Sequence, residues 1–359
     1  MRKTYVIAEA GVNHNGDIDL AKKLIDIAVN AQADAVKFQT FKTENVISMD
    51  APKAEYQIET TGVEESQFEM VKKLELSFEQ FSELKLYCDD HNIEFLSTPF
   101  DIESADFLID HLQIDTIKIP SGEITNAPLI YHIAQKSPKI ILSTGMSTLS
   151  EIESALGVIA FGFLGRVEIP SIEAFKAAFI SPEGQRLLKE RVTLLHCTTE
   201  YPAPVQDVNL LAMNTMSTAF GLQVGYSDHT EGIAIPIAAV ALGATVIEKH
   251  ITYNKLAEGP DHKASLSPEE LNEMIRGIRQ VELAKGSGVK IPSESELKNL
   301  NIARKSIVAL KKIKQGEKLT AENITIKRPG TGISPFEYWN VLKKNAPKDY
   351  DNDQQITLV

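Results

Sequence analysis

The fold is most legible in one part of the sequence: Gly225-Tyr226-Ser227-Asp228-His229-Thr230, then an apolar run over 232–243, then Val246-Ile247-Glu248-Lys249-His250. Apolar residues precede the first segment, and both segments end in polar residues, as buried strands do where they leave a sheet. The run between them is long enough for a helix and is closed by Gly243, a residue type favoured just after a helix. Two parallel strands joined by a right-handed helical crossover would bring His229 and His250 to the same edge of one sheet.

These two histidines suggest a metal site. They lie 21 positions apart in the sequence, and two neutral imidazoles at one sheet edge suit Mn²⁺, Zn²⁺ or Fe²⁺. The alternative is that each histidine is a hydrogen-bonded structural residue at a strand end. The pair by itself leaves both interpretations open.

The same alternation of strand and helix runs through the preceding part of the chain. Buried strands are predicted over 4–10, 34–40, 92–98, 115–120, 139–144 and 192–197, and the stretch quoted above supplies the seventh and eighth. Eight strands with intervening helices in about 250 residues predict a (β/α)₈ TIM barrel. The alternative, a doubly wound open sheet, calls for a G-x-G-x-x-G turn after the first strand, and the loop at 11–16 lacks that spacing.

Three segments depart from this alternation. A long polar excursion is expected over 41–66, and a helical insertion over 161–191 with helices near 172–178 and 182–189. A barrel domain is expected over 1–285, followed by a linker over 286–298. Short strands and turns then predict a small β-rich domain over 299–359.

Composition narrows the class of protein. The chain has 359 residues, is 43% hydrophobic and 24% charged, and carries a net charge of −12. The negative charge argues against a nucleic-acid or anionic-membrane surface. We expect a cytoplasmic protein without a membrane segment, in which the well separated Cys88 and Cys197 stay reduced.

Polar and charged side chains occupy the positions where the predicted strands end. In a (β/α)₈ barrel these positions form the C-terminal rim, which carries the chemistry. They are Glu9, Lys37, Gln39, Thr98, Lys118, Ser143, His196, Ser227 and His250.

Lys37 and Lys118 suggest a phosphate site on this rim. Each interrupts an otherwise apolar strand, and a partly buried lysine needs an anionic partner. Hydroxyl groups at Ser143 and Ser227 could add hydrogen-bond donors to a bound phosphate. The alternative is a pair of solvated rim lysines.

Carboxylates on the same rim suggest proton transfer. Glu9 and Glu123 could act as general acid and base if their pKa values are pushed apart. Either could instead be a structural partner of a lysine, and for Glu123 the two interpretations weigh the same. Asp261, after the eighth strand, could bind sugar hydroxyls or could be a turn aspartate.

The order and spacing of several motifs resemble the sialic acid synthase family. The motifs are Ala8-Glu9-Ala10-Gly11-Val12-Asn13-His14-Asn15-Gly16, Ser97-Thr98-Pro99-Phe100, Lys118-Ile119-Pro120-Ser121-Gly122-Glu123, Leu142-Ser143-Thr144-Gly145-Met146, Leu195-His196-Cys197-Thr198-Thr199-Glu200-Tyr201-Pro202, Gly225-Tyr226-Ser227-Asp228-His229-Thr230, Glu248-Lys249-His250 and Gly259-Pro260-Asp261-His262. The tail from Arg304 to Gly332 resembles the antifreeze-like (SAF) domain of that family. The resemblance covers nearly the whole chain.

The resemblance implies an enzyme that condenses phosphoenolpyruvate with an N-acetylmannosamine-type sugar and releases phosphate. It implies a divalent metal, Mn²⁺ first and Mg²⁺ or Co²⁺ as alternatives, held by His229 and His250. Glu9 would act on the water that attacks C2, with Glu123 and Lys118 as further catalytic candidates. The phosphate would lie among Lys37, Lys118, Ser121, Ser143 and Ser227, with Thr98 nearby and Thr199 where some members have asparagine. The open-chain sugar would be held by Gln39, Tyr201 and Asp261.

The acceptor sugar is the finer question. We expect N-acetylmannosamine, which gives N-acetylneuraminate, and keep 2,4-diacetamido-2,4,6-trideoxymannose, which gives a legionaminate, as the alternative. The segments at 41–66 and 161–191 are expected to read the difference. Two other classes stay open: a metal-dependent aldolase or sugar isomerase, and a non-catalytic carbohydrate-binding protein.

The small C-terminal domain bears on the oligomeric state. The rim offers no guanidinium, whereas Arg328 lies in a glycine-rich loop of the small domain. The resemblance implies a domain-swapped homodimer in which Arg328 reaches the active site of the other subunit.

Overall fold

The computed structural model describes residues 3–53, 58, 66–136 and 139–358. The chain forms two compact units, Met1–Gly286 and Ser287–Val359. The first unit holds all the predicted site residues except Arg328.

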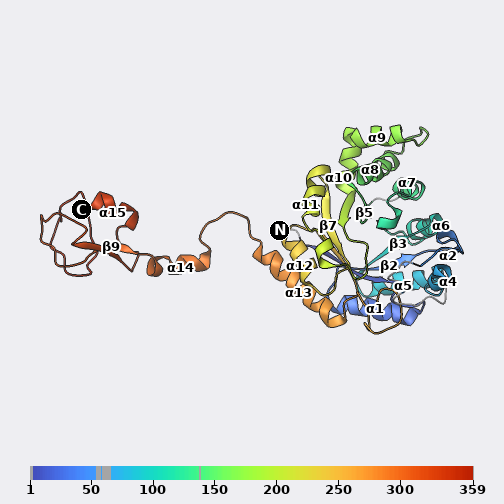
Figure 1. Ribbon diagram of the computed structural model, residues 1–359, viewed down its shortest axis with the longest axis horizontal. Coiled ribbons are helices and arrows are strands. Elements are labelled where there is room, and N and C mark those ends of the chain that lie inside the picture. Colours follow the sequence, from blue (N-terminus) through green and yellow to red (C-terminus); the bar gives the residue numbers. More distant parts are fainter. Residues whose placement is uncertain (1–2, 54–57, 59–65, 137–138, 359) are drawn as a thin grey trace. The chain divides into compact units, whose positions relative to one another are not determined.

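The first unit is built on an eight-stranded parallel sheet, in the order β3-β2-β1-β8-β7-β6-β5-β4. The outermost strands of this order, β3 and β4, contact each other, so the sheet curls into a barrel with helices around it (Figure 1). The predicted (β/α)₈ architecture is confirmed. The strands are β1 Tyr5–Gly11, β2 Ala35–Thr40, β3 Glu94–Pro99, β4 Thr116–Ile119, β5 Lys139–Ser143, β6 Val192–His196, β7 Gln223–Asp228 and β8 Val246–His250.

The barrel interior is layered because side chains in a strand alternate between its two faces. An apolar layer forms the lower part of the interior. Two residues further along four of the strands comes a polar layer, made of Glu9, Lys37, Thr98 and Glu248. The apolar layer consists of Ile7, Ala35, Leu96, Ile141, Leu195 and Val246. The strands therefore carry their reactive groups on top of a packed apolar floor.

Helices cover the outside of the barrel, and several of them begin at a capping box. Ser77 with Gln80, Thr148 with Glu151 and Ser267 with Glu270 each form a reciprocal capping box. The covering helices are α1 Ile18–Asn30, α5 Phe78–Asp90, α6 Ile102–Asp106 continued by η1 Phe107–His111, α7 Ala127–Lys136, α8 Leu149–Phe163, α11 Ala212–Phe220, α12 Ala234–Ala241 and α13 Pro268–Ala284.

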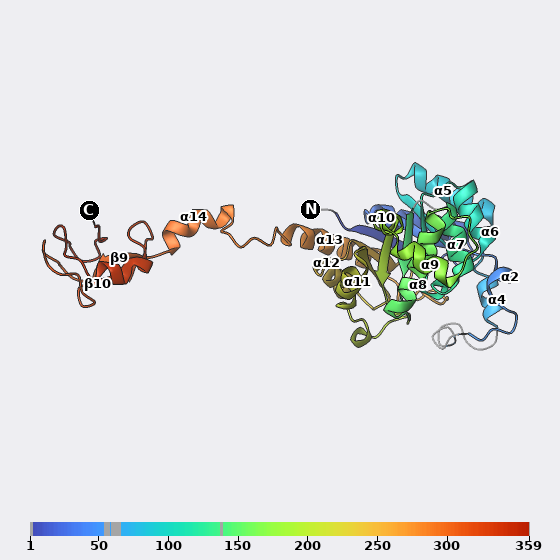
Figure 2. The ribbon, with the colours of Figure 1, turned by 90° about the horizontal axis from the view of Figure 1, so that it is seen from above.

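The helical insertion begins later than expected. Phe161 belongs to α8, where it is fully buried, so the helix runs on to Phe163. The insertion then supplies α9 Ile172–Ile180 and α10 Pro182–Arg191. Both pack against α8 on the outside of the barrel, as Figures 1 and 2 show from two directions.

The excursion after β2 is only partly described. It includes the short helix α2 Thr43–Val46, and α4 Gln67–Lys72 follows it. Residues 54–57 and 59–65, which belong to the expected excursion at 41–66, lie outside the described residues.

The second unit has its own small core. β9 Ser306–Ala309 and β10 Ile324–Lys327 pair antiparallel, with η4 Pro335–Glu337 and α15 Tyr338–Val341 nearby in sequence. The expected linker at 286–298 is helical in its second part, because Ser293 and Glu296 form a capping box that opens α14 Glu294–Ala303. Within the described residues, no helix combines the length and apolarity needed to cross a membrane.

Candidate active site

A cavity of about 290 Å³ opens among the C-terminal ends of the barrel strands. Its walls combine charged, hydroxyl and imidazole side chains with apolar ones. The residues expected at the site that line it are Glu9, Lys37, Gln39, Thr98, Lys118, Ser121, Ser143, Thr199, Tyr201, Ser227, His229, His250 and Asp261.

Strand register brings these residues to one level. Glu9 on β1 lies opposite Lys37 on β2 and His250 on β8. Ser227 on β7 lies opposite Glu248 on β8. Because parallel neighbours in register point to the same side, the functional groups converge on the barrel axis.

The centre of the cavity is a buried chain of alternating charges. The Lys37 Nζ atom lies 2.7 Å from Glu9 Oε2 and 3.7 Å from Glu248 Oε2. The Lys118 Nζ atom lies 3.0 Å from Glu248 Oε1. All four side chains are at most 5% exposed. The lysines are therefore not solvated rim residues, and Glu248 lies between them.

This arrangement separates the two glutamates chemically. Burial raises the pKa of Glu9 to about 7, against the opposing pull of Lys37. Burial also disfavours charge on Glu248, but Lys118 and Lys37 hold its pKa well below its usual value. Glu9 can thus exchange a proton near neutral pH, whereas Glu248 stays ionised.

Hydroxyl groups surround the lysines. Lys37 Nζ donates to Thr98 Oγ1 at 3.0 Å, and Ser227 Oγ donates to Glu248 Oε1 at 2.8 Å. Ser121 Oγ accepts a hydrogen bond from the Gly145 amide at 2.8 Å, which directs the Ser121 side chain. Among the described residues, the buried Ser143 Oγ and Thr199 Oγ1 atoms have no hydrogen-bond partner. A ligand rich in acceptor oxygens would satisfy both.

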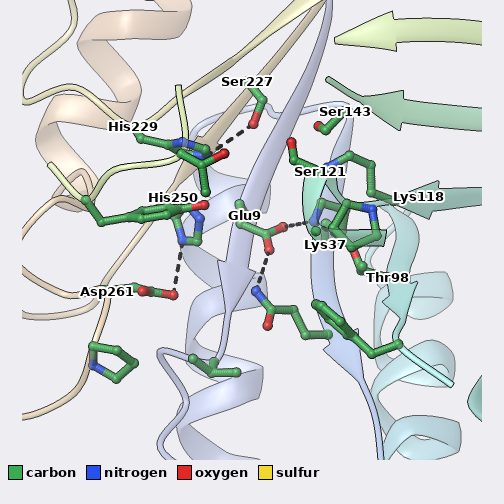
Figure 3. Close-up of a pocket in the computed structure, with 18 of the residues that line it drawn as sticks. Glu9, Lys37, Thr98, Lys118, Ser121, Ser143, Ser227, His229, His250 and Asp261 are labelled. Carbon is green, nitrogen blue, oxygen red and sulfur yellow. Dashed lines mark hydrogen bonds and ion pairs between the residues drawn. The ribbon is translucent and has the colours of Figure 1, made fainter. Parts of the chain in front are cut away.

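His229 and His250 lie together on one side of Glu9, and the lysines lie on its other side (Figure 3). Their ring centroids are 5.8 Å apart. His229 Nδ1 bonds to the Thr198 carbonyl at 2.6 Å, which leaves Nε2 as the acceptor nitrogen. His250 Nδ1 is buried and has no hydrogen-bond partner in the described part of the chain. Each ring thus retains a nitrogen that could bind a metal.

The protonation state of the two histidines also favours metal binding. Burial lowers the pKa of His229 to about 4 and holds the pKa of His250 well below its usual value. Both rings are therefore neutral near pH 7, as a metal ligand must be. No group of three or more His, Cys, Asp or Glu side chains in the described ranges could hold a metal ion. The donor set fits a divalent ion that keeps open positions for water or substrate.

The remaining polar groups line the histidine side. Asp261 Oδ2 lies 3.8 Å from His250 Nδ1, too far for a hydrogen bond, and burial raises the Asp261 pKa to about 6. The Tyr201 ring lies 4.2 Å from the His229 ring, centroid to centroid. Gln39 Nε2 approaches Glu9 Oε1 at 3.5 Å. These groups surround the space next to the histidines.

Glu123 does not line the cavity, and Arg328 belongs to the other unit. Glu123 ends the short helix η2 Ser121–Glu123, whose turn directs Ser121 into the cavity while Glu123 accepts a hydrogen bond from Asn126 at 2.7 Å. Arg328 belongs to the second unit, where its Nε donates to the Ala303 carbonyl at 3.0 Å.

Glu248 and the apolar residues of the cavity lining were not predicted from the sequence. A signal for Glu248 exists, because it stands two residues before His250 in one strand and so shares its face. The apolar lining residues after β1, β2 and β3 carry no such signal, since isolated apolar residues occur everywhere in a chain.

Comparison with known proteins shows the family to which the chain belongs. The NeuB family model matches residues 24–290, and the SAF domain model matches residues 304–349. The N,N'-diacetyllegionaminic acid synthase of Campylobacter jejuni is 53% identical over 99% of both chains. The enzyme of the same name from Legionella pneumophila is 44% identical over 94% of this chain and 89% of its own.

A solved structure agrees. The N-acetylneuraminic acid (sialic acid) synthetase of Leptospira borgpetersenii superposes with a TM-score of 0.65 at 32% identity, covering 83% of this chain and 90% of that one. The resemblance to sialic acid synthases is thus confirmed for the barrel and for the tail. The chain belongs to the NeuB family, whose relatives include the sialic and legionaminic acid synthases, and it is an enzyme of that family with an SAF domain after its barrel.

Proposed function

We propose that the enzyme condenses phosphoenolpyruvate with 2,4-diacetamido-2,4,6-trideoxymannose and water, giving N,N'-diacetyllegionaminate and phosphate. The proposal prefers the alternative acceptor to the first expectation, N-acetylmannosamine. The relatives named as N,N'-diacetyllegionaminic acid synthases are 53% and 44% identical, whereas the sialic acid synthetase of known structure is 32% identical.

The observation that carries the proposal is a pair of unsatisfied buried hydroxyls in the same cavity as two buried lysines. Ser143 and Thr199 lack partners among the described residues, and Lys37 and Lys118 lie in the same cavity. A phosphate supplies acceptor oxygens for the hydroxyls and charge for the lysines. We therefore assign this end of the cavity to the phosphate of phosphoenolpyruvate.

The histidine end then holds the sugar aldehyde. A divalent ion bound by His229 and His250 would act there as a Lewis acid towards the carbonyl oxygen. Gln39, Tyr201 and Asp261 surround the rest of the open-chain sugar. Holding both substrates with the aldehyde carbon next to the enol carbon is the first contribution of the protein.

The reaction then proceeds in balanced steps. C3 of phosphoenolpyruvate bonds to C1 of the sugar, the aldehyde oxygen takes up a proton and becomes a hydroxyl, and C2 is left electron-poor. Glu9, with its pKa near 7, takes a proton from the water that adds to C2. The hydroxyl group on the tetrahedral C2 centre then loses its proton, and the bond from C2 to the phosphate oxygen breaks with its electron pair leaving on phosphate, so that C2 becomes a ketone. The lysines and hydroxyls stabilise the departing phosphate.

Phosphate release tests this function. We expect a colorimetric assay with phosphoenolpyruvate and Mn²⁺ to show release with the diacetamido sugar, at a higher kcat/KM than with N-acetylmannosamine. An aldolase or isomerase would convert sugar without releasing phosphate, and a carbohydrate-binding protein would do neither. Absence of phosphate with both sugars would reject the proposal.

We also propose that the active enzyme is a homodimer in which Arg328 serves the site of the other subunit. The support is the family resemblance, together with the lack of any arginine among the described residues that line the cavity. Mixing two inactive variants, described in the Discussion, tests it.

A further inference from the structure

One side of the cavity is an apolar wall, defined here as Val12, Phe41, Met70, Val71, Leu74 and Phe100. Val12, Phe41 and Phe100 are each the first residue after a barrel strand, β1, β2 and β3 respectively. Met70 and Val71 lie on α4, and Leu74 follows it. Apart from its backbone groups, the wall offers a sugar no hydrogen-bond donor or acceptor stronger than a thioether sulfur.

The apolar wall is a small structure of its own. Val12, Phe41 and Leu74 form a buried cluster that is separate from the main barrel core, with Val71 and Phe100 packed against it. The Phe41 and Phe100 rings meet edge to face at 6.3 Å. Because this cluster sits above the strand ends rather than between sheet and helices, the barrel does not need it for its core.

A carboxylate fixes α4 against the segment after β2. Glu75 accepts hydrogen bonds from the Thr43 amide at 3.0 Å and from Thr43 Oγ1 at 2.9 Å. It also lies 3.4 Å from Lys42 Nζ and 3.0 Å from Lys72 Nζ. The apolar wall is therefore held in place before any ligand arrives, as specificity requires.

Most of the phosphate end lies on a different side of the barrel from the apolar wall. The apolar wall rises over β1, β2 and β3, whereas Lys118, Ser143 and Ser227 belong to β4, β5 and β7. Lys37 is on β2, but its Nζ atom lies 3.7 Å from Glu248 Oε2, on the way to Lys118. In the strand order, β5 to β7 are separated from β1 to β3 by β4 on one side and β8 on the other. The reacting carbon must meet the enol carbon near the axis, so the far end of the sugar points away from the phosphate.

We propose that the apolar wall receives the C6 methyl group of the acceptor and makes the enzyme selective for 6-deoxy sugars. This inference rests on the proposed function and names the feature of the substrate that the site reads. A C6 hydroxymethyl group would bring a hydroxyl against the wall and lose its hydrogen bonds to water. An apolar pocket discriminates against an added hydroxyl by about 100-fold.

The test uses two acceptors that differ only at C6, namely 2,4-diacetamido-2,4,6-trideoxymannose and its 6-hydroxy counterpart. The measured quantity is the ratio of their kcat/KM values, from phosphate release. Met70→Gln and Val71→Thr add polar atoms to the wall at nearly constant volume, and we expect the double variant to reduce the ratio about tenfold. Val46→Thr is the matched control, because Val46 packs against the same cluster but is not among the cavity-lining residues.

Val71→Ala guards against misfolding of the double variant, since Val71 is only half-buried and alanine favours a helix. It removes apolar contact and should also reduce the ratio, whereas the control keeps the wild-type value. An unchanged ratio in folded wall variants would overturn the inference while the proposed function stands. The inference would also be overturned if the wall variants changed the preference between acceptors that differ only at C4, because the wall would then contact the C4 acetamido group. If wild type released phosphate with neither sugar, the proposed function would fail first, and the inference with it.

Discussion

Replacing Glu248 by glutamine should destabilise the barrel and at the same time strengthen its binding of phosphate. Glu248 is the carboxylate between Lys37 and Lys118, with oxygen to nitrogen distances of 3.7 and 3.0 Å. It also accepts the hydrogen bond of Ser227. A glutamine keeps the shape and that hydrogen bond but removes the negative charge.

The magnitude follows from the two distances. At an effective dielectric constant near 20, each charge pair is worth about 5 kcal/mol before the cost of burial is counted. That cost offsets much of the attraction, and breaking a buried pair by removing one partner destabilises proteins by about 3–5 kcal/mol. We expect Glu248→Gln to lie near 3 kcal/mol, because Lys37 keeps Glu9 as a partner at 2.7 Å.

Urea unfolding with and without inorganic phosphate measures both effects. Phosphate should stabilise Glu248→Gln more than wild type, because it finds two lysines with one carboxylate fewer. A tenfold gain in phosphate affinity corresponds to about 1.4 kcal/mol.

Asp228→Asn is the control. It breaks the ion pair with Lys249, 2.6 Å long, whose partners are both fully buried and do not line the cavity. This variant should lose stability without gaining phosphate affinity. If Glu248→Gln were as stable as wild type, or bound phosphate no better, Glu248 would not be balancing the lysines.

Three further outcomes are expected. His250→Ala should lose the activity that Mn²⁺ restores after chelation while its circular dichroism stays native, and full activity of a metal-depleted His250→Ala protein would remove the histidine from the metal site. Burial raises the pKa of Glu9 to about 7, so the ionised fraction of its carboxyl group, which acts as the base, increases as pH rises. Wild-type kcat/KM should therefore climb between about pH 6 and 8. Glu9→Gln should be slow and lack that slope, and a slope kept in this variant would assign the titration to another group. Mixing Arg328→Ala with His229→Ala protein should restore activity, because a heterodimer with sites shared between subunits has one intact site. Demonstrated subunit exchange without activity would show that Arg328 does not act in trans.

Much of the fold could be predicted from the sequence because its signals are local. Buried strands ending in polar residues, and capping pairs such as Ser267 with Glu270, are legible within a few positions. Since parallel strands present their C-terminal ends on one side, naming the strand ends also named eight residues that line the cavity, namely Glu9, Lys37, Gln39, Thr98, Lys118, Ser143, Ser227 and His250.

Other features depended on distances that no local pattern encodes. Glu123 stands two residues after Ser121, yet the turn of the short helix η2 directs its side chain away from the cavity. Its carboxylate accepts a hydrogen bond from Asn126 instead. The insertion at 161–191 was expected to read the acceptor, but its helices pack on the outside of α8. A sequence gives the spacing of such segments along the chain but not the side of the barrel on which they dock.

The residue types at the strand ends can be predicted from the sequence alone, because the two-residue period of a strand is a property of the backbone. Their pairing with one another depends on how the chain folds. Barrel closure carries Glu248 to Lys37 and Lys118, which are remote in sequence, and burial there lets Glu9 hold a proton near neutral pH. The apolar wall likewise arises from three strand ends and α4 meeting in space. Charge pairing and desolvation depend on distance and enclosure, and both exist only once the chain has folded.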